Sequence, residues 1–401
     1  MKKFLSLAFL LLSLSAFATI PNYKAPEILA RANIGVGYNL PEMSFLSNTS
    51  PVINNRGDVS FKLMAFGGEN KQGLWIKKAS EENGKIVYTA PADRLLTDPS
   101  LNDKGQVAFN QYDEGVTDGI FTIDSESEEV NQALKPENDE IAYYTYPQVL
   151  TNGKVYFRGT NQENSRSYYK YDGFSLSSII AEGVTSYGQK SSYLFKPYLN
   201  DSGSMVFKRR IGEAGEWDER NPDEILVLKT NGSTYGSVVI AKDKDSDPES
   251  KFLGFTNSPS ISNSGTVAFI AILEDNSKGI ILSTEGKLTN LAIEKSDNIS
   301  EIELFAPKVN DQGLVIFRAK DMAGLRGIYV TSAEGTRRLI GEGDEVMTDL
   351  GLATILSNPN YPGFGGDVDM NDQGEIVFYC LVIGAEDNQE WGSAVFKISP
   401  L

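Results

Sequence analysis

One short pattern returns seven times along this chain and constrains its fold more than any other feature. Each copy contains an apolar segment, a polar turn that ends in glycine, and a second apolar segment. The turn glycines are spaced by 48 to 62 residues: Gly57, Gly105, Gly153, Gly203, Gly265, Gly313 and Gly374. A polar turn closed by glycine between two apolar segments is typical of a β-hairpin. The repeat therefore predicts a periodic all-β fold.

Three further positions around the glycine carry the same residue type in most copies. Phenylalanine follows the glycine by four residues in every copy: Phe61, Phe109, Phe157, Phe207, Phe269, Phe317 and Phe378. Proline precedes it by six residues in all copies but the last, which has Val368. Asparagine precedes it by three residues in all copies but two, which have Leu150 and Ser262. Asparagine closes turns through its side chain and glycine adopts positive φ, so we expect both to form the turn. The phenylalanine and the apolar residue two before it share one face of a strand that is apolar on both faces, which predicts burial between two sheets.

Two more apolar segments follow each hairpin, as at residues 327–330 and 338–343. Four antiparallel strands per unit of about 40 to 50 residues, without helical periodicity, indicate a propeller blade. The seven copies predict a seven-bladed β-propeller. The last copy ends after its third strand, and residues 27–33 resemble the missing fourth strand. We therefore expect the N-terminal strand to complete the last blade, because this closure hides the exposed edges.

The turn and strand at residues 102–109, NDKGQVAF, carry a resemblance to a known family. This pattern resembles the choice-of-anchor tandem repeat NxxGxxAF-containing proteins of bacteria, and the resemblance covers essentially the whole mature chain. It implies an exported protein and no particular activity. The hairpins are also distantly similar to the repeats of TolB-type propellers, which implies an interaction scaffold.

The first 18 residues have the features of a secretory signal peptide. Lys2 and Lys3 precede an apolar run over residues 4–14, and Ala16 and Ala18 provide the small residues of a cleavage site. We expect cleavage after Ala18, a single propeller domain over residues 19–401, and a periplasmic or secreted location. There is no cysteine near the cleavage site, so we do not expect a lipid anchor. No later segment is long and apolar enough to predict insertion into a membrane.

Composition narrows the function classes. The formal net charge of −17 argues against nucleic acid and anionic lipid as partners. Histidine is absent, which excludes an imidazole base, a Ser-His or Cys-His pair and histidine metal ligands. Cys380 is the single cysteine and lies in an apolar segment, so we expect it to be a small core residue.

Candidate binding residues come from the two places where the repeat spacing lengthens, after Gly203 and after Gly313. Irregular loops on a rigid ring are common binding surfaces. The candidates are Arg209, Arg210, Trp217, Asp218, Tyr361 and Phe364. Trp217 and Tyr361 are aromatic platforms suited to stacking on a sugar or a peptide, and the alternative for Trp217 is that it packs its own loop.

One acidic loop has the spacing of a calcium site. Its carboxylates are Asp243, Asp245, Asp247 and Glu249. Alternating carboxylates let a tight loop direct several oxygens at one calcium ion, but Pro248 stands where an EF-hand requires glycine. The alternative is a solvated acidic loop. Calcium is the one cofactor that the sequence suggests.

These observations favour an exported, monomeric binding module that holds a protein or glycan on the irregular-loop face. No nucleophile elbow, P-loop or dinucleotide motif identifies an enzyme. Two alternatives stay open. The first is a glycoside hydrolase or lyase that uses Asp and Glu at the channel mouth, and the second is a structural component of an envelope assembly.

Overall fold

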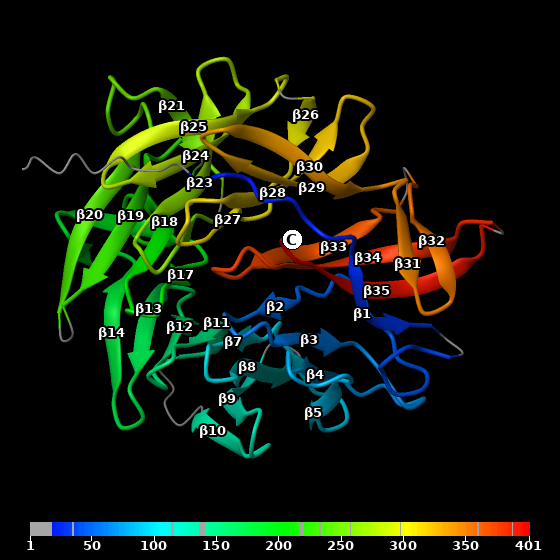
Figure 1. The fold of residues 1–401 in the computed structure, drawn as a ribbon. Helices are drawn as coiled ribbons and strands as arrows, with labels where there is room; N and C mark the ends of the chain where they lie inside the picture. Colours follow the sequence, from blue (N-terminus) through cyan, green and yellow to red (C-terminus); the bar gives the residue numbers. More distant parts are fainter. Residues whose placement is uncertain are drawn as a thin grey trace, which may run out of the picture.

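In the computed structural model, seven small antiparallel sheets surround a common axis as the blades of a β-propeller (Figure 1). The structure describes residues 18–401 except 34–35, 114–115, 136–140, 217, 219, 232–233, 257, 297, 359–360 and 387. The predicted signal peptide, apart from Ala18, lies outside the described residues. Within the described part of the chain no helix is long and apolar enough to cross a membrane. The predicted all-β, seven-bladed fold is confirmed.

The first four blades follow the chain in order. Blade 1 contains β2 (Val52–Ile53), β3 (Val59–Leu63), β4 (Gly73–Lys77) and β5 (Lys85–Thr89). Blade 2 contains β6 (Leu95–Leu96), β7 (Ser100–Leu101), β8 (Gln106–Asp113), β9 (Val116–Asp124) and β10 (Val130–Leu134). Blade 3 contains β11 (Tyr143–Val149), β12 (Val155–Thr160), β13 (Arg166–Tyr171) and β14 (Leu176–Ala181). Blade 4 contains β15 (Thr185–Ser186), β16 (Gln189–Leu194), β17 (Tyr198–Leu199), β18 (Met205–Ile211), β19 (Asp223–Thr230) and β20 (Tyr235–Lys242).

The last three blades complete the ring. Blade 5 contains β21 (Phe252–Phe255), β22 (Ser260–Ile261), β23 (Val267–Leu273), β24 (Lys278–Thr284) and β25 (Lys287–Ile293). Blade 6 contains β26 (Ile299–Ile302), β27 (Lys308–Val309), β28 (Val315–Asp321), β29 (Arg326–Ser332) and β30 (Gly335–Gly341). Blade 7 contains β31 (Glu345–Thr348), β32 (Gly351–Ile355), β33 (Phe364–Met370), β34 (Ile376–Gly384), β35 (Glu390–Ile398) and β1 (Glu27–Ala32).

The N-terminal strand closes the ring as the sequence predicts. β1 pairs antiparallel with β35, from Glu27 opposite Lys397 to Ala32 opposite Ser393. In Figure 1 the blue β1 lies beside the red β35, although the two strands come from opposite ends of the chain. The pairing gives the last blade its outer strand and covers the free edge of β35.

The repeated turns have the predicted geometry. All seven turn glycines have φ between 79° and 86°, a region that side chains rarely adopt. Where asparagine is present, its Oδ1 accepts hydrogen bonds from the backbone of its own turn. In blade 2, for example, Asn102 Oδ1 accepts from the backbone amides of Lys104 and Gln106, both at 2.9 Å.

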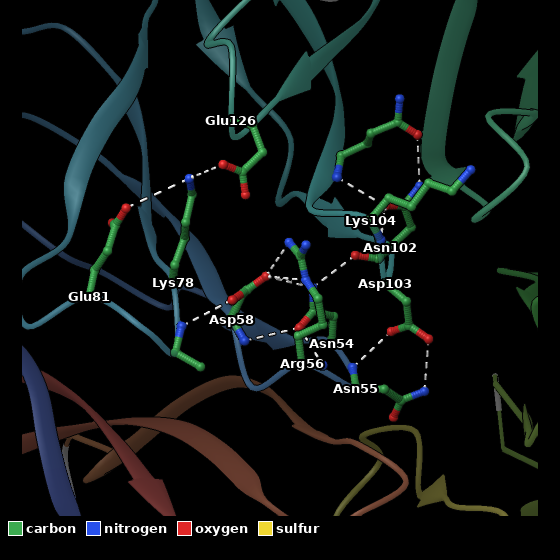
Figure 2. A network of polar contacts seen from close by, with 12 residues as sticks. Asn54, Asn55, Arg56, Asp58, Lys78, Glu81, Asn102, Asp103, Lys104 and Glu126 are labelled. Carbon is green, nitrogen blue, oxygen red and sulfur yellow. Dashed lines mark hydrogen bonds and ion pairs between the residues drawn. The ribbon is translucent and has the colours of Figure 1, made fainter.

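In the five turns that contain it, the asparagine side chain also links the turn to the next blade, which the sequence analysis did not predict. Asn54 Nδ2 donates to the carbonyl of Asn102 at 2.9 Å, and Asn102 Nδ2 donates to the carbonyl of Leu150 at 2.9 Å. Figure 2 shows the first of these links, with the Asn55 and Asp103 side chains facing each other beside it. Asn371 of the last blade donates in the same way to the carbonyl of Asn54 of the first blade, at 3.0 Å.

The core is divided among the interfaces between blades. Buried apolar residues form seven clusters, and each combines side chains from two neighbouring blades. The repeat phenylalanine faces the preceding blade: Phe378 of β34, for example, packs with Ile316 and Ile328 of blade 6. The residue beside it, Val377, packs with blade 1 instead. The prediction of a strand buried on both faces is therefore confirmed, and Cys380 is fully buried in the same core.

The innermost strand of most blades is broken near the repeat proline. In blade 4, β16 and β17 both pair with β18 and are separated by Phe195, Lys196 and Pro197. The break leaves a backbone carbonyl free in the innermost strand. A polar side chain of the preceding blade, five residues after the turn glycine of that blade, donates a hydrogen bond to this carbonyl. Among the described residues six such bonds are found: Lys62 to Leu96, Asn110 to Tyr144, Arg158 to Leu194, Lys208 to Phe255, Arg318 to Gly366 and Tyr379 to Leu46. The break is thus a stable feature, and it places the residues around the proline at the channel.

Candidate functional site

Two positions of the repeat supply most of the side chains that line the axial channel. The first position precedes the repeat proline and carries Ser50, Asp98, Tyr146, Lys196, Ser258, Ala306 and Asp367. The second position follows the proline, or Val368 in blade 7, and carries Val52, Ser100, Gln148, Tyr198, Ser260, Lys308 and Asp369. Most of these residues border one cavity of about 480 Å³.

A second cavity of about 250 Å³ adjoins the first. The two share Tyr146, Lys196, Tyr198 and Asp367, so they form one hollow, which we call the axial basin. The axial basin is our candidate functional site, because it is concave, lies on the axis of a rigid ring and collects ionisable and aromatic side chains from several blades.

Ion pairs organise the charged groups of the axial basin. Lys196 Nζ lies 3.1 Å from Asp367, and Lys308 Nζ lies 3.4 Å from Asp369. Burial would raise the pKa of Asp367, but Lys196 and Lys308 overcome this effect and lower it below the ordinary value. Burial alone would lower the pKa of Lys308, but Tyr198 and Asp369 raise it above the ordinary value. Asp367 is therefore a carboxylate and Lys308 an ammonium at neutral pH.

The ring of Tyr198 lies close to two ammonium groups. Lys308 Nζ is 4.2 Å and Lys196 Nζ is 4.9 Å from the centre of its ring. Its hydroxyl is buried and has no hydrogen-bond partner of acceptable geometry among the described residues, although Lys196 is near enough to interact with it. This arrangement presents hydrogen-bond donors to the axial basin.

Tyr146 borders the axial basin with an unusual backbone. Its φ is 55°, and Pro147 follows it, a combination that is strained for an aromatic residue. The residue is 38% exposed, and the Arg158 guanidinium lies 4.9 Å from the centre of its ring. Backbone strain of this kind gathers at binding sites, where the surrounding structure imposes it.

The opposite end of the channel is lined by polar side chains, most of which border a further cavity of about 210 Å³. The residue after the repeat asparagine forms a ring there: Asn55, Asp103, Thr151, Asp201, Asn263, Asp311 and Asp372. Asn55 Nδ2 donates to Asp103 and to Asp372, both at 2.9 Å, and Asn263 bonds to Asp201 and Asp372. Burial and the neighbouring Asp103 raise the pKa of Asp201. These hydrogen bonds join side chains of different blades, so the ring has a structural role in holding the blades together.

The structure does not bring the sequence-predicted binding residues together at the axial basin. Arg209 is buried and pairs with Glu224 at 2.9 Å, and Arg210 pairs with Asp223 at 3.0 Å, so both hold blade 4 together. Phe364 is 2% exposed and packs against Phe378 in the core, which removes it from the surface.

The other predicted binding residues lie in exposed loops. Asp218 is paired with Arg220 on the surface, and Tyr361 is 64% exposed next to an isolated bridge with Asn358. Trp217 lies outside the described residues. Ligand binding by Asp218, Trp217 and Tyr361 stays a prediction.

The predicted calcium loop is closed by its own hydrogen bonds. Asp243 is buried, and its two carboxylate oxygens accept from the backbone amides of Asp223 at 2.6 Å and Ser246 at 2.9 Å. Burial raises the pKa of Asp243. In the part of the chain that the structure describes, no group of three or more acidic, cysteine or histidine side chains is arranged to hold a metal ion. Asp243, Asp245, Asp247 and Glu249 are thus not assembled as ligands.

The residues of the axial basin were missed because we treated the repeat as purely structural. The signal that could have found them is present in the sequence. Proline holds its place in six copies, while the residues on either side of it change from serine to lysine, tyrosine and aspartate. Variable polar residues at fixed positions of an innermost strand indicate a lining rather than a core.

Comparisons with known proteins agree with this fold. The sequence profile of a family of unknown function (DUF7453) matches residues 94–302, just over half of the chain. No curated protein matches the chain significantly. Among solved structures, an oligogalacturonate lyase in complex with manganese is similar with a TM-score of 0.55 at 9% identity, covering 95% of this chain and 98% of that chain.

Two other solved structures are similar at the same level. The oligogalacturonate lyase of Vibrio parahaemolyticus has a TM-score of 0.54 at 9% identity and also covers 95% of this chain and 98% of that chain. The polysaccharide lyase Uly1 has a TM-score of 0.51 at 8% identity and covers 88% of this chain and 89% of that chain. At such low identity these likenesses concern the fold alone, whereas the profile match identifies the chain as a member of the DUF7453 family of unknown function.

Proposed function

We propose that this protein is an exported β-propeller binding module that takes a glycan into the axial basin. One observation carries the proposal: a cavity of about 480 Å³ on the propeller axis, bordered by tyrosine and lysine side chains from several blades. Its volume lies in the range of about 300 to 1,000 Å³ that is typical of ligand pockets.

A glycan suits this cavity better than a folded protein does. Stable protein interfaces bury roughly 800 Å² on each partner, which requires a broad surface rather than a hollow. Tyrosine rings such as Tyr112, Tyr146 and Tyr198 offer both a stacking face and a hydroxyl, and sugars use both. The export of the protein to the periplasm or beyond is supported by the signal-peptide features of residues 1–18 and by the resemblance to the NxxGxxAF repeat proteins.

The test is a glycan array probed with residues 19–401. The blocking variant is Val52→Trp, because Val52 borders the cavity and a larger ring there would fill it. The control is Tyr361→Ala, which changes an exposed aromatic residue of the irregular loops. We expect Val52→Trp to lose array binding at an unchanged melting temperature and Tyr361→Ala to keep it. Binding that survives Val52→Trp and disappears in Tyr361→Ala would overturn the proposal and favour the loop face.

The enzyme alternative receives less support from the charges of the site. A glycoside hydrolase needs one carboxyl group with a raised pKa to donate a proton. Asp367 has a lowered pKa, because Lys196 and Lys308 stabilise its charged form more than burial destabilises it. The similar lyases carry their activity in their own sites, and the shared fold transfers none of it. Incubation with the bound glycan, followed by product analysis, separates binding from cleavage.

A further inference from the structure

We propose that the glycan bound in the axial basin carries a monovalent oxyanion, and that this group sits between Lys196 and Lys308 against the Tyr198 hydroxyl. The oxyanion is the carboxylate of a uronic acid or a sulfate ester, which share one charge and several acceptor oxygens. This inference rests on the proposed function, because it names the chemistry that the same site would recognise.

The first argument is that two cations converge on one ring. Lys196 lies between β16 and β17 of blade 4, and Lys308 lies in β27 of blade 6. Their ammonium groups are nevertheless both within 5 Å of the centre of the Tyr198 ring, at 4.9 and 4.2 Å. Each lysine has one carboxylate partner, Asp367 or Asp369, and a further anion placed close to both ammonium groups would be attracted by both.

The second argument is that donors in the axial basin lack acceptors. Lys308 Nζ forms an ion pair with Asp369 at 3.4 Å, but it donates no hydrogen bond of acceptable geometry to any described residue. The Tyr198 hydroxyl is likewise buried without a hydrogen-bond partner of acceptable geometry among the described residues, although Lys196 lies near it. Buried polar groups are normally satisfied, so unpaired donors on residues that line a cavity indicate an acceptor supplied from outside. Hydrogen bonds to a charged acceptor are the strongest that such donors can form.

The third argument is the charge of the axial basin. Its ionisable lining comprises four cations and three carboxylates: Lys62, Lys196, Lys308, Arg158, Asp98, Asp367 and Asp369. The net charge of +1 contrasts with the net charge of −17 for the whole chain. A ligand with one negative charge neutralises this site, whereas a doubly charged phosphate monoester would bring the basin to a net negative charge.

The fourth argument concerns the rest of the ligand. Tyr146 is 38% exposed, and its strained φ of 55° holds the ring at the border of both cavities. Arg158 lies over this ring at 4.9 Å and forms no ion pair with any described residue. A sugar ring stacked near Tyr146 would place an acidic substituent within reach of the lysines. An acidic glycan is therefore the ligand class that accounts for both the aromatic and the cationic groups.

The test is calorimetric titration of residues 19–401 with four oligosaccharide probes: an oligouronate, its methyl ester, a sulfated oligosaccharide and a neutral one. We expect the oligouronate or the sulfated probe to bind, and the methyl ester and the neutral probe to bind at least roughly tenfold more weakly. The better of the two acidic probes identifies the source of the oxyanion. Binding should also weaken as salt increases, because an ionic contact is screened.

The matched variants remove one hydroxyl each. Tyr198→Phe should weaken binding of the acidic probe roughly tenfold and leave the melting temperature unchanged or higher, because the lost hydroxyl has no partner in the free protein. Tyr329→Phe is the control, since Tyr329 also has a buried hydroxyl without a partner but does not line the axial basin. Lys308→Gln should reduce both the affinity and its dependence on salt.

The outcomes separate the two proposals. Equal affinity for the oligouronate and its methyl ester, together with no effect of Tyr198→Phe, would overturn the oxyanion while the binding module stands. Binding of the neutral probe as tight as that of both acidic probes would overturn the acidic class of glycan. If the array shows binding that Val52→Trp abolishes, but none of the four probes competes with it, the oxyanion proposal is overturned. If the array shows no binding that Val52→Trp abolishes, the proposed function itself is overturned.

Discussion

The closure of the propeller depends on a buried ion pair, and removing its cation should destabilise the whole ring. Arg31 of β1 is completely buried. Its Nε and Nη2 atoms each donate to Asp349 at 2.8 Å, and its Nη1 donates to the carbonyl of Trp391 at 2.8 Å. Asp349 lies in the turn between β31 and β32, and Trp391 lies in β35. One guanidinium therefore joins the N-terminal strand to two other strands of blade 7.

The structure sets the size of the effect of Arg31→Met. The substitution keeps an apolar side chain of similar length but leaves the Asp349 carboxylate, whose side chain is 16% exposed, without its cation. Removing one partner of a buried pair costs about 3–5 kcal/mol, and the partial exposure of Asp349 places this case near the lower value, at about 3 kcal/mol. Removing both partners with Arg31→Met and Asp349→Leu leaves no unpaired charge, so most of this loss should be recovered.

Equilibrium urea unfolding of residues 19–401, followed by circular dichroism, measures the effect. The matched control is Arg220→Met, which breaks the pair of Arg220 and Asp218, whose side chains are 90% and 43% exposed. We expect no measurable shift for the control, because exposed pairs contribute little. An unfolding midpoint for Arg31→Met equal to that of the wild type, or a double variant less stable than the single one, would refute the reasoning.

Two further predictions concern the channel. Asn102→Ala removes four side-chain hydrogen bonds of 2.9 Å and should lower the free energy of unfolding by about 2–3 kcal/mol. Asn152→Ala removes one exposed hydrogen bond in the blade 3 turn, where Leu150 replaces the repeat asparagine. It should lower the free energy of unfolding by well below half as much in the same urea titration. The lowered pKa of Asp367 contributes stability that is complete above the ordinary aspartate value near pH 4 and is lost as the pH falls through the lower folded value. Unfolding midpoints measured from pH 5 to pH 2 should therefore fall less steeply for Asp367→Asn than for the wild type, and parallel curves would contradict this assignment.

The fold could be predicted because each part of the repeat acts locally. Glycine in the turn needs no information from elsewhere in the chain to adopt a φ near 80°, and the seven turns differ by only a few degrees. The phenylalanine at a fixed distance from the turn places one apolar face toward each neighbouring blade. Closure by β1 followed from counting strands in the last copy. In each case the local residue type and the global fold require the same conformation, so they reinforce each other.

The inter-blade bonds could not be predicted in the same way. Arg158 and Arg318 look in the sequence like surface charges that follow a buried strand, and their carbonyl partners lie 36 and 48 residues further along the chain. Only the break in the innermost strand explains why a hydrogen-bond donor is needed there. The same break exposes Lys196 and Tyr198 to the channel, so the site depends on a backbone irregularity that apolar periodicity does not encode.

The two long repeat spacings also have another explanation than the one the sequence suggested. We expected the insertion after Gly313 to overhang a binding surface, but part of it forms the β31–β32 hairpin, whose Asp349 holds Arg31 of the N-terminal strand. This extra length therefore serves ring closure at the blade that is built from both ends of the chain. In blade 4, Arg210 at the start of the other insertion pairs with Asp223 where that insertion ends. In blades 4 and 7 the extra length thus carries ion pairs that hold the blade together, and ligand binding by Asp218, Trp217 and Tyr361 stays a prediction, whereas our proposal places ligand chemistry where the spacing is constant and the side chain varies.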